Sequence, residues 1–334
     1  MPHWTVDAPM RLAFDDVTAL KVRTIAGSVA ILATGETPAL DITRISGQPL
    51  VVSHEDGVLT VSYEDLSWDG LLEWLRPRSH SAEMTVTVPR DCPAQVGVVA
   101  ATAVLSGVTA RTSVRSVSGP ITLDGLAGSV DAHTVGGDVE AQDLSGSVTF
   151  NSVSGDLTLA GGSLDRLDAK TVSGSVTADV HLGKPGNVRV TTVSSDIALR
   201  LPADPDARVN LRSASGRVLS EFDRLSSARS AASRSVNGTL GAGTGHISVT
   251  TLSGRVTLLR RVPPARPTPD RPTGPAGAAP PQDRAPGGPP RDGSREAPAG
   301  DGAAAGDPWA AATDAAPTDG AGAHDDAQTK GDAR

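Results

Sequence analysis

The chain has almost no cysteine and very few aromatic residues. Its 334 residues include one Cys, one Tyr, three Phe and four Trp. The single cysteine, Cys92, excludes an intramolecular disulfide framework. The seven histidines share no spacing with acids or with Cys92, so the converging ligands of a zinc site are missing as well. A core almost without rings must be built from Val, Ile, Leu and Ala, which fits a narrow structure with two walls.

Long apolar runs and a surplus of positive charge are also missing. No stretch approaches the roughly 18 apolar residues of a membrane-spanning helix, and residues 1–7 lack the charged and apolar regions of a signal peptide. The 30 Lys and Arg residues against 38 Asp and Glu give a formal net charge of −8, without the clustered positive charge that nucleic-acid binding requires. We therefore expect a cytoplasmic protein that binds no nucleic acid, with weak peripheral membrane association as an alternative.

Glycine recurs at regular intervals through the middle of the chain. The first five of these glycines are nine residues apart. The step then widens to between 19 and 21 residues, and serine replaces glycine at Ser195. The last interval, of 38 residues, corresponds to two steps of 19. The series is Gly119, Gly128, Gly137, Gly146, Gly155, Gly174, Ser195, Gly216 and Gly254. A step of about 20 residues that holds two short strands is typical of a solenoid, in which coils stack on one another. The sequence therefore predicts an all-β fold, a parallel β-solenoid (β-helix) with short two-stranded coils.

Alignment on these corners produces columns of apolar side chains. The second and fourth residues after each corner are apolar, with Ser220 as the exception, and polar residues such as Thr158 stand between them, as in a strand with one buried face. These columns run from Ile121 and Leu123 to Val256 and Leu258. A second, less regular strand in each coil is expected around pairs such as Val148 and Phe150.

We expect the apolar column two residues before each corner to be buried too. Its members are Val117, Val135, Val153, Val172, Val193, Ala214 and Leu252. An aspartate at Val153 would then place an unpaired charge in a dry stack and cost several kcal/mol, whereas Thr158→Asp would cost far less.

Glycine and serine at the corners have a local explanation. A residue without Cβ adopts positive φ at low cost, so we expect this conformation at Gly155 and its equivalents. The serine before the corner, as at Ser154, is expected to bond to neighbouring hydroxyls or to the corner backbone.

Composition divides the chain after residue 262. Residues 1–262 are predicted to form one β-solenoid domain, with irregular N-terminal coils and a cap in residues 1–95 and regular repeats in residues 96–262. Residues 263–334 are rich in Pro, Ala, Gly and Asp and hold almost no branched aliphatic residues. Such a segment cannot bury a core, so a disordered C-terminal tail is predicted.

Before the regular repeats, the β pattern continues with less order. Strand pairs are expected around Gly27 and around Gly47, with further strands at Val58–Tyr63 and at Met84–Val88, where Pro89 ends the strand. The open end of a solenoid exposes unpaired backbone and has to be covered. We interpret this segment as the first coils and cap of the stack.

One segment, Asp65–Arg76, departs from the β pattern. It places apolar residues at the i, i+3, i+4 and i+7 positions of one helical face, and a second Trp lies beside them. The resulting stripe consists of Trp68, Leu71, Leu72, Trp74 and Leu75. We interpret it as a short helix that caps the stack, and a docking surface for a partner or a membrane interface is the alternative.

The residues for catalysis or metal binding are not arranged as such chemistry requires. Polysaccharide-cleaving enzymes often use β-helices with clustered acids, but Asp138 and Asp156 stand at corners, where Asp is common, and the short coils leave no long loops to wall a cleft. The turn of calcium-binding β-rolls matches only in part at Gly136–Asp138. No histidine accompanies the repeated serines as a base. We expect no catalytic residue, no metal site and no cofactor.

The repeat unit resembles that of a known family. Units of the type Ser-Val-Ser-Gly-Asp-Leu-Thr-Leu, entered from an irregular β segment, are similar to the bacterial "putative adhesin" family, a domain of unknown function. The resemblance covers roughly residues 10–260, and the stretches that carry it are Thr85–Pro89, Arg115–Leu123, Asn151–Leu159, Lys170–Thr177 and Thr250–Leu258. It implies a β-solenoid without recognised catalytic residues, in a family with members tied to envelope stress or found near the membrane.

Together these features predict a non-enzymatic structural or interaction module, an adhesin-like β-solenoid whose partner is a protein or a cell-envelope component. Two alternatives stay open. The first is a membrane-associated or envelope-stress binding protein that uses the stripe from Trp68 to Leu75. The second is a carbohydrate-active β-helix enzyme, which would need an acidic groove along one wall.

Overall fold

The computed structural model describes residues 3–63, 80–230 and 233–261. Every regular element in these ranges is a β-strand, so the predicted all-β class is confirmed. The described residues lie in one compact unit, Met1–Pro267. The predicted helix Asp65–Arg76, with its stripe of Trp68, Leu71, Leu72, Trp74 and Leu75, lies outside the described residues, and so does the predicted tail 263–334.

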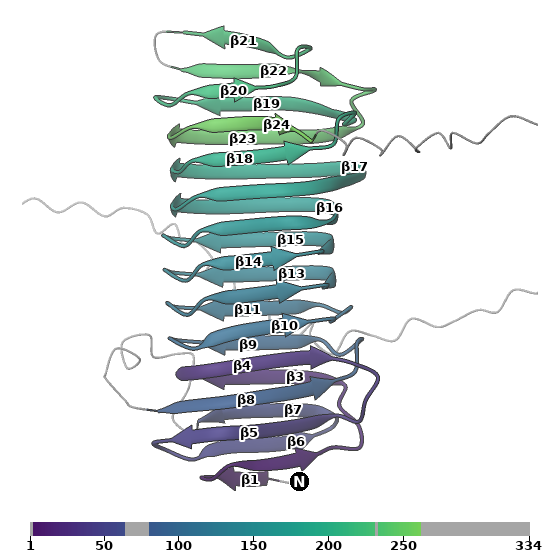
Figure 1. Ribbon diagram of the computed structural model, residues 1–334, viewed down its shortest axis with the longest axis vertical. Helices are drawn as coiled ribbons and strands as arrows, with labels where there is room; N and C mark the ends of the chain where they lie inside the picture. Colours follow the sequence, from purple (N-terminus) through teal and green to yellow (C-terminus); the bar gives the residue numbers. More distant parts are fainter. Residues whose placement is uncertain (1–2, 64–79, 231–232, 262–334) are drawn as a thin grey trace, which may run out of the picture. The chain divides into compact units, whose positions relative to one another are not determined.

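Two ladders of parallel strands form the centre of this unit (Figure 1). Partner strands are 18 residues apart through most of it, as in the pairs Val130↔Val148 and Ile121↔Val139. The first ladder contains β9 (Ala94–Val98), β11 (Thr112–Ser116), β13 (Ala127–Thr134) and β15 (Ser145–Ser152), and the second contains β10 (Thr102–Ser106), β12 (Ile121–Asp124) and β14 (Val139–Gln142). The long strands β16 (Leu157–Ser173) and β17 (Val176–Ser194) run through both ladders. Each coil therefore repeats the one before it, with equivalent residues directly aligned.

Antiparallel strands close both ends of the parallel centre. At the N-terminal end, β1 (His3–Val6), β6 (Leu50–Glu55) and β7 (Val58–Tyr63) pair antiparallel, as do β2 (Met10–Ala13), β5 (Ala39–Ser46) and β8 (Ser81–Val88). They join the parallel strands β3 (Ala19–Thr24) and β4 (Ala26–Ala33). At the other end, β19 (Ala207–Ser213), β22 (Arg234–Leu240) and β21 (Ser226–Arg229) pair antiparallel.

The last strands of the chain do not form the last coil. β24 (Val256–Arg260) lies between β18 (Ile197–Leu201) and β20 (Val218–Ser220), and β23 (Gly245–Ser253) lies between β17 and β19. The expectation that Gly254 simply follows Gly216 along the stack is therefore wrong. In the observed order both edges of β23 and β24 are paired, and β22 covers the outer edge of β19 in the last coil.

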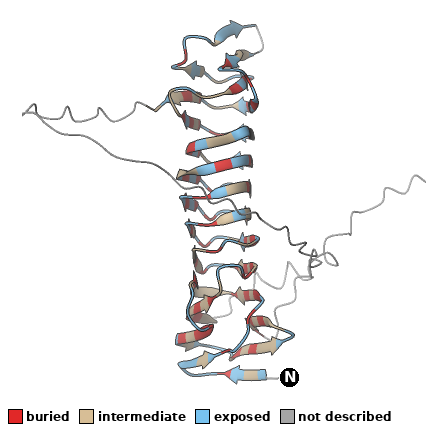
Figure 2. Ribbon diagram, turned by 90° about the vertical axis from the view of Figure 1, so that its right-hand side faces the viewer, coloured by how far each residue is buried: buried red, intermediate tan, exposed pale blue. Residues whose placement is uncertain are grey.

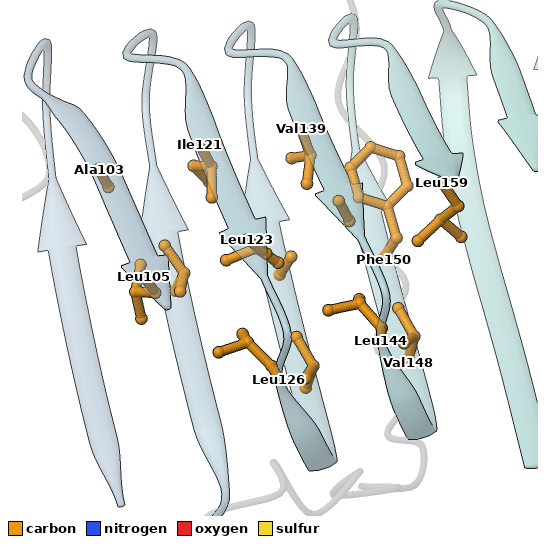
Figure 3. Close-up of a cluster of buried hydrophobic side chains, with 14 of the residues drawn as sticks. Ala103, Leu105, Ile121, Leu123, Leu126, Val139, Leu144, Val148, Phe150 and Leu159 are labelled. Carbon is orange, nitrogen blue, oxygen red and sulfur yellow. The ribbon is translucent and has the colours of Figure 1, made fainter. Parts of the chain in front are cut away.

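The core lies between the two ladders and is aliphatic, as the sequence predicts (Figure 3). Ile121, Leu123 and Val139 are buried to within 1% in the column positions that follow the corner, and Phe150 is completely buried on the second strand. Thr158 and Glu140 face solvent. The inside and outside of these strands are thus predicted correctly.

The apolar column before the corner, in contrast, is outside. Val135, Val153, Val172, Val193 and Leu252 are between 45% and 61% exposed, so the predicted burial of Val153 is wrong. The residue before each of them, as in Ser152, is a buried Ser or Thr, and the alternation is visible along the strands in Figure 2. The period of two holds within β15, where Phe150 and Ser152 point inward, but the corner between Val153 and Leu157 interrupts it.

The corner glycines also serve another purpose than expected. Gly155 does not have positive φ, but a Cβ there would collide with the carbonyl oxygen of Gly137 in the neighbouring coil. Close stacking of backbone is therefore what requires glycine at this corner. The expected positive φ is found at two equivalents of Gly155, Gly174 (φ 115°) and Gly254 (φ 126°), and also at the opposite corner, for example at Gly146 (φ 97°).

Candidate binding surface

The apolar side chains that precede the exposed corners form one continuous row along an edge of the stack. Pairing aligns the residues directly before them, as in Thr134↔Ser152 and Ser152↔Thr171, so the apolar side chains follow one another at one per coil. We call this row the apolar ridge; in stacking order it consists of Val117, Val135, Val153, Val172, Val193 and Leu252. Val117 is partly buried and the other five are exposed.

Buried hydroxyls hold the ridge in its outward position. The Ser152 hydroxyl accepts a hydrogen bond from the Gly155 N–H at 2.8 Å, and Thr134 accepts the equivalent bond from Gly137 at 2.8 Å. Because the corner's polar backbone needs partners inside the stack, a hydroxyl is stable there and the neighbouring valine is turned to solvent. The corner at Thr192 is an exception, since neither its hydroxyl nor that of Ser195 has a hydrogen-bond partner among the described residues.

The outer serines tie neighbouring coils together, as the sequence predicts. The hydroxyl of Ser154 donates to the carbonyl oxygen of Val135 at 3.1 Å, and that of Ser118 donates to Val99 at 3.1 Å. The hydroxyl of Ser253 donates to that of Ser194 at 3.2 Å. The backbone under the ridge is therefore fixed from both sides of the corner.

A hollow of about 310 Å³ runs beside the ridge. Val117, Val135 and Val153 form its apolar side, and the polar side consists of Arg115, His133 and Asn151. The amide nitrogen of Asn151 lies 3.4 Å from Nδ1 of His133. The hollow therefore combines an apolar wall with hydrogen-bonding groups, as ligand-binding surfaces commonly do.

Opposite charges flank the ridge on its two sides. On the strand before the corner, Arg115, His133, Asn151 and Lys170 are aligned by the register of their strands. Burial lowers the pKa of His133 and the charge of Arg115 lowers it further, while Asp131 acts in the opposite direction, so the imidazole is neutral near pH 7. The permanent cations of this column are Arg115 and Lys170.

The column on the other side of the ridge contains three acids, with Ser175 and Arg255 at two of its other positions. Asp138, Asp156 and Asp196 are exposed and stand directly before the strands of the second ladder. Each accepts a backbone hydrogen bond from the next coil through Oδ1, from the N–H groups of Asp156 (3.0 Å), Ser175 (2.6 Å) and Arg255 (2.7 Å) respectively. These carboxylates are thus held in place by the backbone.

A second hollow, of about 430 Å³, lies at the C-terminal end of the stack. Its lining includes Asp204, Asp206 and Asp223, and the Arg260 guanidinium lies 5.0 Å from the centre of the Phe222 ring. The backbone N–H of Thr244 donates to Asp206 and lowers its pKa, which keeps that carboxyl ionised. The lining contains no histidine, cysteine or serine.

An ion-pair cluster fastens the end of the described chain. Asp179 on β17 pairs with Arg200 and with Arg261, and Arg261 also contacts the His181 ring, with its Nη1 2.9 Å from Nε2. Arg200 and then Arg261 lower the pKa of Asp179. Each side chain of this cluster contacts another member of the cluster. We therefore assign the cluster the structural role of holding the end of β24 in its inserted position.

The stripe that the sequence predicts for capping or docking, Trp68 to Leu75, lies outside the described residues. Among residues 3–63, 80–230 and 233–261, no group of three or more His, Cys, Asp or Glu residues is placed to hold a metal ion, and no helix has the length and hydrophobicity of a membrane span. Sequence reasoning missed the ridge because it assigned the valines to the core. The signal that identifies the ridge residues is the Ser or Thr that precedes every one of them.

Comparison with known proteins identifies a family and several similar solved structures. The family model "Toastrack DUF4097" matches residues 47–259. Similar solved structures include a "putative cell adhesion protein" from Clostridium sporogenes (11% identity, 76% of this chain and 100% of that chain, TM-score 0.21). Another is a "putative adhesin" from Parabacteroides merdae (14% identity, 75% of this chain and 95% of that chain, TM-score 0.29). A third is a "putative lipid binding protein" from Parabacteroides distasonis (9% identity, 75% of this chain and 96% of that chain, TM-score 0.35). No curated protein matches the chain.

Proposed function

Because the chain belongs to the Toastrack DUF4097 family, a domain of unknown function, we propose its role from its own geometry. The protein is a non-enzymatic binding module, a β-solenoid scaffold whose apolar ridge is the surface that contacts its partner. The proposed partner is a protein or a component of the cell envelope.

The observation that carries this proposal is the unbroken row of exposed apolar side chains. Single exposed aliphatic residues are ordinary, but a contiguous apolar patch rimmed by polar residues is typical of an interaction site. Complete burial of a valine gains about 1.5–3 kcal/mol, so covering a half-exposed one gains about half of that. Five such residues would supply several kcal/mol before the cost of association is subtracted.

The hollows favour binding over the carbohydrate-active alternative. Glycoside hydrolysis requires two carboxyl groups across the scissile bond, and the lining of the hollow beside the ridge contains no carboxylate. In the second hollow, Asp206 is committed to the N–H of Thr244 and its lowered pKa makes it a poor proton donor.

The proposal is tested with a fluorescent apolar probe, anilinonaphthalene sulfonate, titrated into the full chain. We expect Val135→Ser/Val153→Ser to reduce the fluorescence enhancement several-fold. Leu219→Ser is the matched control, because Leu219 is 51% exposed, as Val135 is, but lies outside the ridge. Equal probe binding by the ridge variant and the control, or hydrolysis of a polysaccharide that one point substitution abolishes, would contradict the proposal.

The membrane-associated alternative and the cytoplasmic location remain proposals. Vesicles of phosphatidylcholine and phosphatidylglycerol provide the test, by co-sedimentation with the wild type and with Trp68→Ala/Trp74→Ala. Co-sedimentation that is lost in this variant while its melting temperature stays unchanged would support membrane docking through the stripe. Loss of folding would instead support the capping interpretation.

A further inference from the structure

We propose that the partner of the apolar ridge is a second copy of this chain, bound side by side with the two stacks parallel. This inference rests on the proposed function, because it names the occupant of the same surface. In this arrangement the two-fold axis runs along the stacking direction, and the ridges of the two copies meet at the centre of an isologous interface.

The charges on the two sides of the ridge select this orientation. The column before the corner contains the cations Arg115 and Lys170. The column after it contains Asp138, Asp156 and Asp196, with Arg255 beside Leu252, so its net charge along the ridge is negative. A two-fold axis along the stack places the cationic column of each copy opposite the acidic column of the other. Two antiparallel stacks would place columns of like charge opposite each other, which is unfavourable.

The groups that would meet are available and already ordered. Lys170 and Asp156 belong to none of the ion pairs among the described residues. The backbone hydrogen bonds to Oδ1 of Asp138, Asp156 and Asp196 fix these side chains before any contact forms. Less side-chain entropy is then lost on association than for mobile surface carboxylates.

The spacing of the ridge also fits a second copy better than an extended peptide. Successive ridge residues are separated by one strand spacing, about 4.8 Å, and a second copy presents its own ridge at the same step. Side chains on one face of an extended peptide recur about every 6.6–6.8 Å. Only the second copy therefore matches valine to valine along the whole ridge.

The size of the ridge sets the expected strength. From Val117 to Leu252 it spans five strand spacings, or about 24 Å, and the two sheets of such a stack lie about 10 Å apart. This strip is smaller than the roughly 800 Å² per partner of a standard stable interface. We therefore expect a weak, reversible dimer that forms only towards concentrations of about 100 µM and weakens in high salt.

Sedimentation velocity of the full chain, at concentrations from about 1 to 100 µM, measures this association. We expect the wild type to shift from monomer to dimer across the series. Val135→Ser/Val153→Ser should lower the association constant at least about tenfold, and Leu219→Ser should leave it unchanged. Thermal melts of the same samples establish that each variant is folded.

A charge exchange provides a second test that does not alter the apolar residues. Lys170 of one copy lies one coil, about 4.8 Å along the stack, from the level of Asp156 in the other copy, which is within reach of a lysine side chain. Lys170→Glu and Asp156→Lys should each reduce self-association, because each brings like charges together at two symmetric positions. An equimolar mixture of the two variants should associate again, since Glu faces Lys at one position and the native Lys faces the native Asp at the other. Both side chains are exposed, but Asp156→Lys removes the acceptor of the Ser175 N–H, so thermal melts of both variants and of their mixture establish that the proteins are folded.

Three results would overturn the inference. They are a wild type that stays monomeric throughout, a dimer that the ridge substitutions leave intact, and a mixture of the charge variants that does not re-associate. If the wild type is monomeric but the apolar probe still distinguishes the ridge variant from Leu219→Ser, the proposed binding surface stands and only its occupant is wrong. Vesicle binding that Val135→Ser/Val153→Ser abolishes would assign the ridge to a lipid surface instead.

Discussion

The two corners of the coil that contains Phe150 carry the same three-residue pattern and bury it in opposite ways. At one corner, Leu144-Ser145-Gly146, the leucine is 1% exposed and the glycine has φ 97°. At the next corner, Val153-Ser154-Gly155, the valine is 49% exposed and the glycine does not have positive φ. Figure 3 shows Leu144 and the equivalent Leu126 among the buried side chains. The difference teaches that spacing alone does not assign a side chain to the core, because the direction in which the backbone turns decides it.

The largest expected difference is between truncation of the aliphatic residue at the buried corner and the same truncation at the exposed corner. Leu144→Ala should lower the free energy of unfolding by about 2–5 kcal/mol, because it removes buried contacts and leaves a cavity. Val153→Ala, at the exposed corner, should change it by less than about 0.5 kcal/mol. Denaturant unfolding of both variants measures the difference, and equal losses would mean that the two corners are not distinct.

The glycine at the exposed corner should be the next most sensitive position. Gly155→Ala introduces a Cβ against the carbonyl oxygen of Gly137, and because backbone must move we expect a loss of about 1–3 kcal/mol. Gly35→Ala is the control, since a Cβ there meets no atom within 4 Å and its φ is not positive. A melting temperature that falls for Gly35→Ala as much as for Gly155→Ala would contradict the close-stacking explanation.

The buried hydroxyl is expected to matter less, but only where it is satisfied. Ser152→Ala removes the acceptor for the Gly155 N–H and should cost about 1–2 kcal/mol. Thr192→Val removes a buried hydroxyl that has no partner, so we expect it to be neutral or stabilising. Denaturation midpoints of the two variants measure the difference. If both substitutions changed the stability in the same direction and by the same amount, the proposed role of the hydroxyl would be refuted.

The smallest expected effect is a pH dependence of the folding stability, caused by His133 beside the apolar ridge. Burial of His133, reinforced by Arg115, lowers its pKa in the folded state, so the unfolded chain binds this proton more readily. Stability should therefore fall as the pH drops below the ordinary histidine value of about 6.5 towards the lowered folded value. His133→Asn, which copies Asn151 one coil away, should remove this component of the stability profile between these two values. An unchanged profile in the variant would show that the histidine is not responsible.

Much of the fold follows from the sequence, because the strand period and the corner positions are local properties. The alternation of Leu157, Thr158 and Leu159 is enough to place one face inside, and the strands around Gly27 and Gly47 lie where expected. The insertion of β24 between β18 and β20 was not predictable in this way, since it depends on pairing between segments 59 residues apart, as in Ile197↔Val256. The division of the chain after residue 262 and the stripe at Trp68 stay predictions.

The binding surface was harder to predict than the fold. Val153 and Leu157 are both apolar and both lie near Gly155, and a period of two carried across the corner places them on the same face. The corner reverses this relation through the hydrogen bond between Ser152 and Gly155. If the alternation is followed only up to the corner, with Phe150 and Ser152 facing inward, Val153 and its equivalents are placed outside.

Thiol labelling tests most directly whether the ridge faces solvent. The native Cys92 is 1% exposed, and burial together with Asp91 raises the pKa of its thiol to about 12, so the wild type should react with a maleimide only very slowly. Cysteine is then introduced at each corner in turn, as Val153→Cys and as Leu144→Cys. We predict rapid labelling of the first in the folded protein and labelling of the second only after denaturation. Comparable protection of both positions in dilute protein would contradict the outward ridge and the function inferred from it.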